Sequence, residues 1–125
     1  MIYLDTHTVA MLYQGALQGF SEAACQAIDD EDDLRISPMV LLELEYLYEI
    51  KRIKVPGRKI VDALGSDIGL KMCNALFADV AHKAVEERWT RDPFDRLILA
   101  QARLARARLI TKDRAMHKHY SQALA

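Results

Sequence analysis

The sequence predicts an α/β protein, a three-layer α/β/α sandwich with a central parallel sheet of four to five short strands. Two observations lead to this class. Short apolar runs alternate with longer segments in which apolar residues recur every three or four positions, and strands that alternate with helices normally form a parallel sheet covered by helices. The chain has 125 residues, a length that suits one core, so we expect a single domain over residues 1–125.

Four short runs have the composition of strands buried on both faces, and they cover residues 2–5, 34–37, 77–81 and 108–111. Helical periodicity predicts helices over residues 7–14, 20–30, 38–52, 57–73, 81–90 and 93–107. Two helix starts are marked by a capping side chain before a proline, at Ser37-Pro38 and Asp92-Pro93. Glycines within residues 57–73 predict that this helix is broken or divided in two.

Charge is distributed unevenly along the chain, although the formal net charge is only −1. Residues 1–50 contain ten acidic side chains and one basic one, whereas residues 88–125 contain three acidic and nine basic ones. The net charge therefore does not exclude a nucleic-acid partner, because the basic side chains are concentrated in the last third. No apolar run is long enough to cross a bilayer and no signal-peptide pattern opens the sequence, so we expect a cytoplasmic protein.

Two carboxylates stand at the ends of predicted strands. Asp5 follows the three apolar residues of the first strand, and Asp113 follows the 108–111 strand by two residues. Parallel strands end at one edge of their sheet, and ligands bind in the crevice beyond that edge. We therefore expect both side chains to lie at the same edge.

Glu43 lies on the apolar side of its predicted helix. A helical wheel places it with Val40, Leu47 and Ile50, opposite the other charged residues of the helix. A buried carboxylate must be paired, protonated or bound to a metal, because burying a lone charge is very costly. A salt bridge, to Lys51 or to an arginine, is the simpler interpretation when Glu43 is taken alone.

Two more acids stand at the start of the 93–107 helix. Asp92 suits the N-cap, and Asp95 lies one turn further on, where the helix dipole also favours an acid. Four of these acids converging on one edge would repel one another unless a cation lies between them, and carboxylate oxygens suit Mg²⁺ or Mn²⁺ rather than zinc. Such a site activates water and stabilises charge on a phosphoryl group. Basic side chains of the same region would hold a phosphate backbone, among them Arg91, Lys112 and Arg114.

Four segments carry a recognisable pattern, namely IYLDTHTV at residues 2–9, SPMVLLELEYL at 37–47, RDPFDRLILAQA at 91–102 and LITKDRAM at 109–116. Together they resemble PIN-domain ribonucleases, and specifically the VapC toxins of type II toxin–antitoxin systems. The resemblance implies a PIN-like fold and a Mg²⁺-dependent endoribonuclease, with Mn²⁺ as a substitute ion. It implies four catalytic and metal-binding acids, which are Asp5, Glu43, Asp95 and Asp113.

The same resemblance implies supporting roles around these acids. Thr6 and Thr111 would position an acid or a metal-bound water, Asp92 would cap its helix and support the site, and Arg96 would pair with the acids or touch phosphate. As partners it implies an RNA substrate, a VapB-type antitoxin that inhibits the enzyme, and a second copy in a homodimer. The chain ends sooner than the family pattern, so its last strand should be short or absent.

Two other classes of protein remain open. A response-regulator receiver domain also has this length, acids at strand ends and Mg²⁺, but here Asp5 is followed by Thr6 and His7 rather than by a second acid. It also needs a phosphoacceptor aspartate after its third strand, which the order of segments does not supply convincingly. A PIN fold without catalytic activity, serving only as a binding module, is the other alternative.

Overall fold

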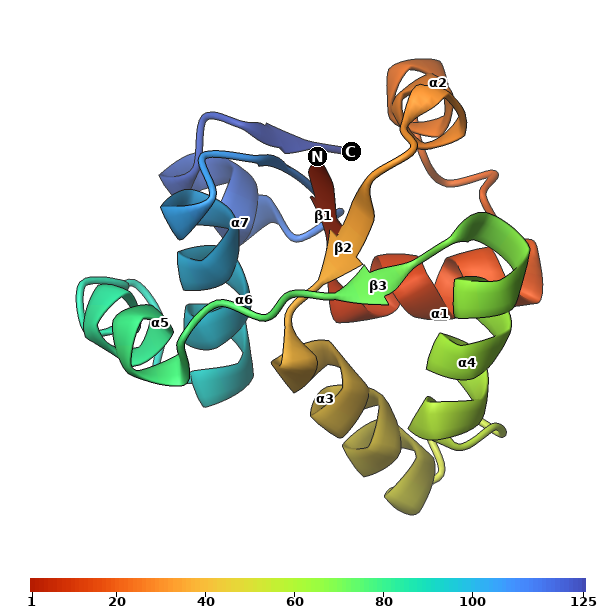
Figure 1. Cartoon of the computed structure of the whole chain (residues 1–125), viewed down its shortest axis with the longest axis horizontal. Helices are drawn as coiled ribbons and strands as arrows, with labels where there is room; N and C mark the ends of the chain where they lie inside the picture. Colours follow the sequence, from red (N-terminus) through yellow and green to blue (C-terminus); the bar gives the residue numbers. More distant parts are fainter.

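The computed structural model describes residues 1–125 and contains one five-stranded sheet in which every pair of neighbours is parallel (Figure 1). The strands are β1 (Ile2–Leu4), β2 (Leu34–Ile36), β3 (Lys71–Met72), β4 (Arg108–Ile110) and β5 (Ala123–Leu124). Their order across the sheet is β3-β2-β1-β4-β5.

Helices cover both faces of this sheet. They are α1 (Thr6–Gln14), α2 (Glu22–Asp30), α3 (Pro38–Glu49), α4 (Gly57–Ile68), α5 (Phe77–Ala84), α6 (Pro93–Leu104) and α7 (Arg114–His119). Figure 1 shows α1, α2 and α4 on one side of the sheet and α5, α6 and α7 on the other, with α3 below the strands' carboxyl ends. The predicted three-layer α/β/α sandwich with a parallel sheet is thereby confirmed.

The strands form the centre of the core. Ile2, Leu4, Ile36, Leu109 and Ile110 are all fully buried, because a parallel sheet with helices on both faces leaves neither face to solvent. This explains why the central strands are mostly apolar and do not alternate between apolar and polar residues. No helix here combines the length and the apolar composition needed to span a bilayer.

The order of the strands has its switch point between β1 and β4. From β1 the chain builds the sheet first in one direction, through β2 and β3, and then in the other, through β4 and β5. The connections on the two sides diverge at this point, and ligands of open α/β sheets bind there. The β1–α1 junction is fixed to β4, because the Asp5 amide and the Thr8 hydroxyl both donate to the Ile110 carbonyl, at 3.2 and 3.0 Å.

The strand predicted over residues 77–81 is wrong, because this segment begins helix α5. Val80 and Ala84 are four residues apart, so they share one helical face and pack on Ala100 of α6. The third strand is instead Lys71–Met72, which follows α4 within the segment predicted as a broken helix. It pairs with Arg35 and Ile36 at the edge of the sheet, where both of its residues are exposed.

The final strand was predicted to be short or absent, and it is short. Ala123 and Leu124 pair with Leu109 and Ile110 of β4, and the carbonyl of Ala125 accepts a hydrogen bond from Ser21 at 3.2 Å. The two residues of β5 therefore form the edge of the sheet on this side, and β4 lies inside it between β1 and β5.

Candidate active site

Asp5 is the most deeply buried acid of the site. It ends β1, caps helix α1 and is only 5 % exposed. Its Oδ1 accepts the Thr8 amide at 2.9 Å, and its Oδ2 accepts a short hydrogen bond from the Thr111 hydroxyl. Because both carboxylate oxygens have a donor, the side chain has one orientation before any ligand arrives.

Thr111 connects Asp5 to the acid that follows β4. Its hydroxyl oxygen accepts the amide of Asp113 at 3.0 Å while its proton goes to Asp5. Asp113 in turn caps α7 and accepts the amides of Ala115 and Met116 at 2.8 and 3.1 Å. The sequence prediction that Asp5 and Asp113 meet at one edge agrees with this placement, since one hydroxyl bridges their two segments.

We expect Thr111→Val to destabilise the protein by about 1–3 kcal/mol, because the buried Asp5 oxygen and the Asp113 amide would both lose a partner. Valine preserves the shape of threonine, and Thr111 is 0 % exposed, so little else changes. Urea denaturation measures the loss, with Thr111→Ser as the control that keeps the hydroxyl. Equal losses in the two variants would contradict this account.

Glu43 reaches the same edge from α3. Its side chain is half-buried and accepts a short hydrogen bond from the Thr6 hydroxyl. None of the ion pairs in the structure involves Glu43, so the salt bridge considered from sequence does not form. Burial raises the pKa of this carboxyl, the Thr6 bond opposes that rise, and the nearby Asp92 adds to it. Ile50, placed on the apolar face by the helical wheel, is exposed.

The start of α6 contributes two acids. Asp92 is exposed and caps the helix, and its Oδ1 accepts the amides of Phe94 and Asp95 at 2.8 and 3.4 Å. Asp95 is half-buried, and burial, followed by the charges of Asp92 and Glu43, raises its pKa to about 7. The charges of Asp113 and Asp5 contribute in the same direction, so both of these acids lie close enough to raise the pKa of Asp95.

The geometry of the cluster fits a divalent cation. Glu43, Asp92 and Asp95 each offer an oxygen within 4.8 Å of the others, and no basic side chain forms an ion pair with any acid of the site. Carboxylates crowded in this way need a counter-charge, and an all-oxygen donor set suits Mg²⁺ or Mn²⁺. Asp92 thus belongs to this group of acids in addition to capping α6.

The arginine predicted to support the acids makes other contacts. Arg96 donates to the carbonyls of Ala84 and Val85 at 3.2 and 3.1 Å, so it caps the end of α5 instead of pairing with the cluster. Lys112 lies over the ring of Phe20, 5.4 Å from its centroid. Arg91 and Arg114 are exposed. Their contact with RNA stays a prediction.

Two histidines near the site were not predicted to matter. His7 follows Thr6 on α1, and its charge lowers the pKa of Glu43. His117 lies one turn beyond Asp113, and its Nε2 donates to the Thr111 carbonyl at 2.6 Å. The only sequence signal for His117 is its spacing of four residues from the Asp113 cap, which places both on one side of α7.

The PIN domain family model matches residues 2–121, and the chain belongs to this family. The match extends from β1 to the end of α7 and includes all five acids. Within curated proteins, the chain is 33 % identical over 120 residues to Ribonuclease VapC22 of Mycobacterium tuberculosis, which covers 94 % of this chain and 91 % of that protein. The family resemblance predicted from sequence is therefore confirmed.

Solved structures give the same fold. A toxin–antitoxin complex from Klebsiella pneumoniae superposes with a TM-score of 0.69 at 20 % identity, covering 100 % of this chain and 97 % of that chain. VapBC2 of Rickettsia felis, bound to a promoter DNA fragment, superposes with a TM-score of 0.64 at 18 % identity, covering 99 % and 96 %. At these identities the superpositions establish the PIN architecture and nothing finer.

Proposed function

We propose that the protein is a Mg²⁺-dependent endoribonuclease that hydrolyses RNA phosphodiester bonds and acts as the toxin of a toxin–antitoxin pair. The observation that carries this proposal is the group of acids Glu43, Asp92 and Asp95, whose oxygens lie within 4.8 Å of one another and which, like Asp5 and Asp113, form no ion pair with a basic side chain. The relationship to a curated ribonuclease supports the choice of RNA as substrate. Asp5, Glu43, Asp95 and Asp113 are the proposed catalytic and metal-binding acids.

Each residue has a distinct task in this mechanism. A bound Mg²⁺ would supply an activated water and offset the charge that develops on the phosphoryl group. Asp5 would be a ligand of the ion, with its carboxylate already oriented by the Thr8 amide and the Thr111 hydroxyl. Thr6 orients Glu43 in the same way from α1. A cation bound by these acids would favour the charged form of Asp95, whose proton would pass to solvent, and so would oppose the effect of crowding on its pKa.

The proposal also includes residues that bind RNA and the proteins with which this chain associates. The exposed cations Arg91, Lys112 and Arg114 are adjacent in sequence to Asp92 or Asp113, so we include them as residues that would bind phosphates of the RNA. Both structural relatives named above are complexes of a toxin with its antitoxin. We therefore include a VapB-type inhibitor, a homodimer and a cytoplasmic location in the proposal.

The metal requirement tests the proposed function directly. We expect the purified protein, free of any antitoxin, to cleave RNA, to stop when EDTA is added, and to recover with Mg²⁺ or Mn²⁺. Glu43→Gln should lower the cleavage rate by about 10²-fold, because it removes charge from the site while keeping the bond to Thr6. Glu49→Gln is the matched control, since Glu49 is an exposed glutamate on the same helix.

Cleavage that persists in EDTA, or equal rates for the two variants, would overturn the metal-dependent mechanism. RNA binding without cleavage under any metal condition would favour the silent binding module. The receiver alternative predicts phosphate uptake from acetyl phosphate. The residues that follow β3, Cys73 and Asn74, offer no carboxylate for such a reaction.

A further inference from the structure

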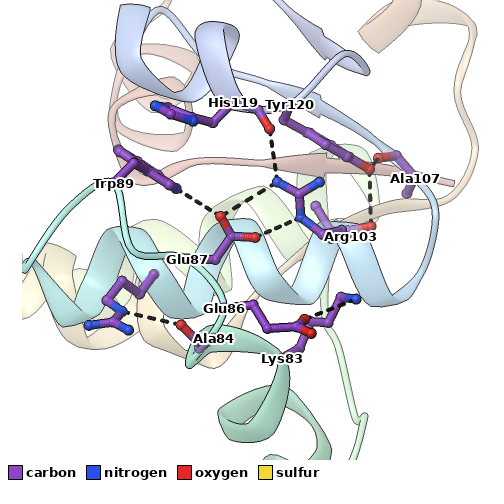
Figure 2. A network of polar contacts seen from close by, with 11 residues as sticks. Lys83, Ala84, Glu86, Glu87, Trp89, Arg103, Ala107, His119 and Tyr120 are labelled. Atoms are coloured by element: carbon purple, nitrogen blue, oxygen red, sulfur yellow. Dashed lines mark hydrogen bonds and ion pairs between the residues drawn. The ribbon is translucent and has the colours of Figure 1, made fainter.

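Glu87 is the only deeply buried acid outside the site. It lies between α5 and α6 and is 3 % exposed. Its Oε1 accepts Arg103 Nε at 2.6 Å, and its Oε2 accepts Trp89 Nε1 at 2.8 Å and Arg103 Nη2 at 3.5 Å. Figure 2 shows these contacts converging on one carboxylate. A buried charge is tolerated only when it is paired and hydrogen-bonded in this way.

Arg103 extends the contact to the C-terminal part of the chain. Its Nη2 also donates to the His119 carbonyl at 2.9 Å, and its guanidinium lies 5.0 Å from the Tyr120 ring centroid. The ring of His119 stacks on Trp89, with centroids 5.3 Å apart and planes 13° apart. We call Glu87, Trp89, Arg103 and His119 the clamp. It joins three parts of the chain, namely the 87–89 segment, the end of α6 and the end of α7 (Figure 2).

Two of these parts lead directly to site acids. The chain from Glu87 reaches Asp92, the cap of α6, within five residues, and α7 begins at its cap Asp113. The other end of the 84–92 segment is held by Arg96, which donates to the carbonyls of Ala84 and Val85. The loop that ends in Asp92 is thus anchored on α6 by two arginines.

We propose that Glu87 is a positioning residue for the acidic cluster, and this inference rests on the proposed metal-dependent function. The clamp does not touch a metal or RNA. It fixes the loop that carries Asp92 and the helix that carries Asp113, so that their oxygens are already placed when a divalent cation binds. Without the clamp the loop keeps the Arg96 contacts at its start, but between Val85 and Asp92 it retains only local contacts, such as that of Arg91 with the Arg88 carbonyl. The loop then has to become ordered when the metal binds, and the entropy lost in this ordering weakens metal binding.

The experiment compares Glu87→Gln and Arg103→Lys with Ile28→Ala, a core truncation on α2 that is remote from the clamp and serves as the destabilised control. Calorimetry measures Mn²⁺ binding to the full-length proteins. Amide hydrogen exchange of Phe94 and Asp95, whose amides Asp92 caps, is measured without metal. Trp89 is the only tryptophan, so quenching of the protein's fluorescence by a dissolved quencher measures how exposed this part of the loop becomes.

We expect Glu87→Gln to raise the Mn²⁺ dissociation constant about 10-fold and to accelerate exchange at Phe94 and Asp95. Arg103→Lys should give a smaller change, because lysine keeps the charge but not the two-pronged contact. Cleavage at saturating metal should stay near the wild-type rate, and Ile28→Ala should leave both binding and exchange at Phe94 unchanged. Wild-type affinity and wild-type exchange in Glu87→Gln would overturn the inference.

The same measurements distinguish a failure of the proposed metal-dependent function from a failure of the clamp proposal. If the wild-type protein binds no Mn²⁺, the metal-dependent function is wrong, whatever the clamp does. The exchange measurement in metal-free protein still decides whether Glu87 positions the Asp92 cap. Unchanged exchange in Glu87→Gln would then reject the clamp on its own.

Discussion

Asp5→Asn should reduce RNA cleavage by about 10³-fold while leaving the protein folded, an effect of about 4 kcal/mol on the transition state. The substitution keeps the side-chain shape and removes its charge. The asparagine carbonyl can still accept the Thr8 amide, and its NH₂ can donate to the Thr111 oxygen. The Thr111 proton can then turn to Met116 Sδ, 3.6 Å away. All hydrogen bonds are kept, so the loss of cleavage reports the lost charge.

The measurement is single-turnover cleavage of RNA by protein prepared without antitoxin, together with thermal unfolding. Asp67→Asn is the control, because Asp67 is an exposed aspartate on α4. Full cleavage by Asp5→Asn would reject the assigned role of Asp5. A large drop in the unfolding temperature would instead mean that the hydroxyl rearrangement at Thr111 does not occur.

The fold was predictable where a helix start carried a cap or where a strand was a continuous apolar run. The helix starts at Pro38 and Pro93 are where their capping residues indicate, and β1 and β4 are apolar runs buried between two layers. The run FADVA at 77–81 is too short to separate a buried strand from one helical face, and it is helical because Val80 packs on α6. The edge strand β3 has two exposed residues and so no hydrophobic signal.

The site was predictable to the same degree and for related reasons. Acids at strand ends and helix caps are positioned by local structure, so Asp5, Asp92 and Asp113 lie where the sequence places them. Arg96 and Glu87 have partners 11 to 16 residues away across the α5–α6 contact. Such pairing depends on how two helices pack, and no spacing within either helix indicates it.

Asp95→Asn should lower the rate of RNA cleavage by about 10³-fold and yet make the metal-free protein more stable at pH 8. Crowding and burial raise the folded-state pKa of Asp95 from 3.8 to about 7. The folded protein therefore binds more protons than the unfolded chain between these values, and its stability falls as pH rises through this window. Above pH 7 the full penalty applies, and the substitution removes it.

The expected gain is modest, because two effects oppose it. Solvent screening reduces the penalty of a half-buried acid to about 2 kcal/mol. Loss of an acid from the first turn of α6 costs up to about 1 kcal/mol through the helix dipole. The net gain of about 1 kcal/mol raises the unfolding temperature by roughly 4 °C for a chain of this size. At pH 4 the gain should disappear, because wild-type Asp95 is then protonated in the folded state.

Saturating metal should make the wild-type protein more stable than Asp95→Asn at pH 8, the reverse of the order expected without metal. Saturating Mg²⁺ stabilises only a protein that binds it in the folded state, so we expect wild type to gain and Asp95→Asn to gain little. Calorimetric unfolding at pH 4 and pH 8, with EDTA or with Mg²⁺, measures all four conditions, and Asp67→Asn should follow wild type throughout. A metal-free Asp95→Asn protein that is less stable than wild type at pH 8 would show that its neighbours do not crowd this carboxylate. In that case Glu43, Asp92 and Asp95 would not be crowded together as the proposed metal site requires, and fewer of the acids would bind the ion.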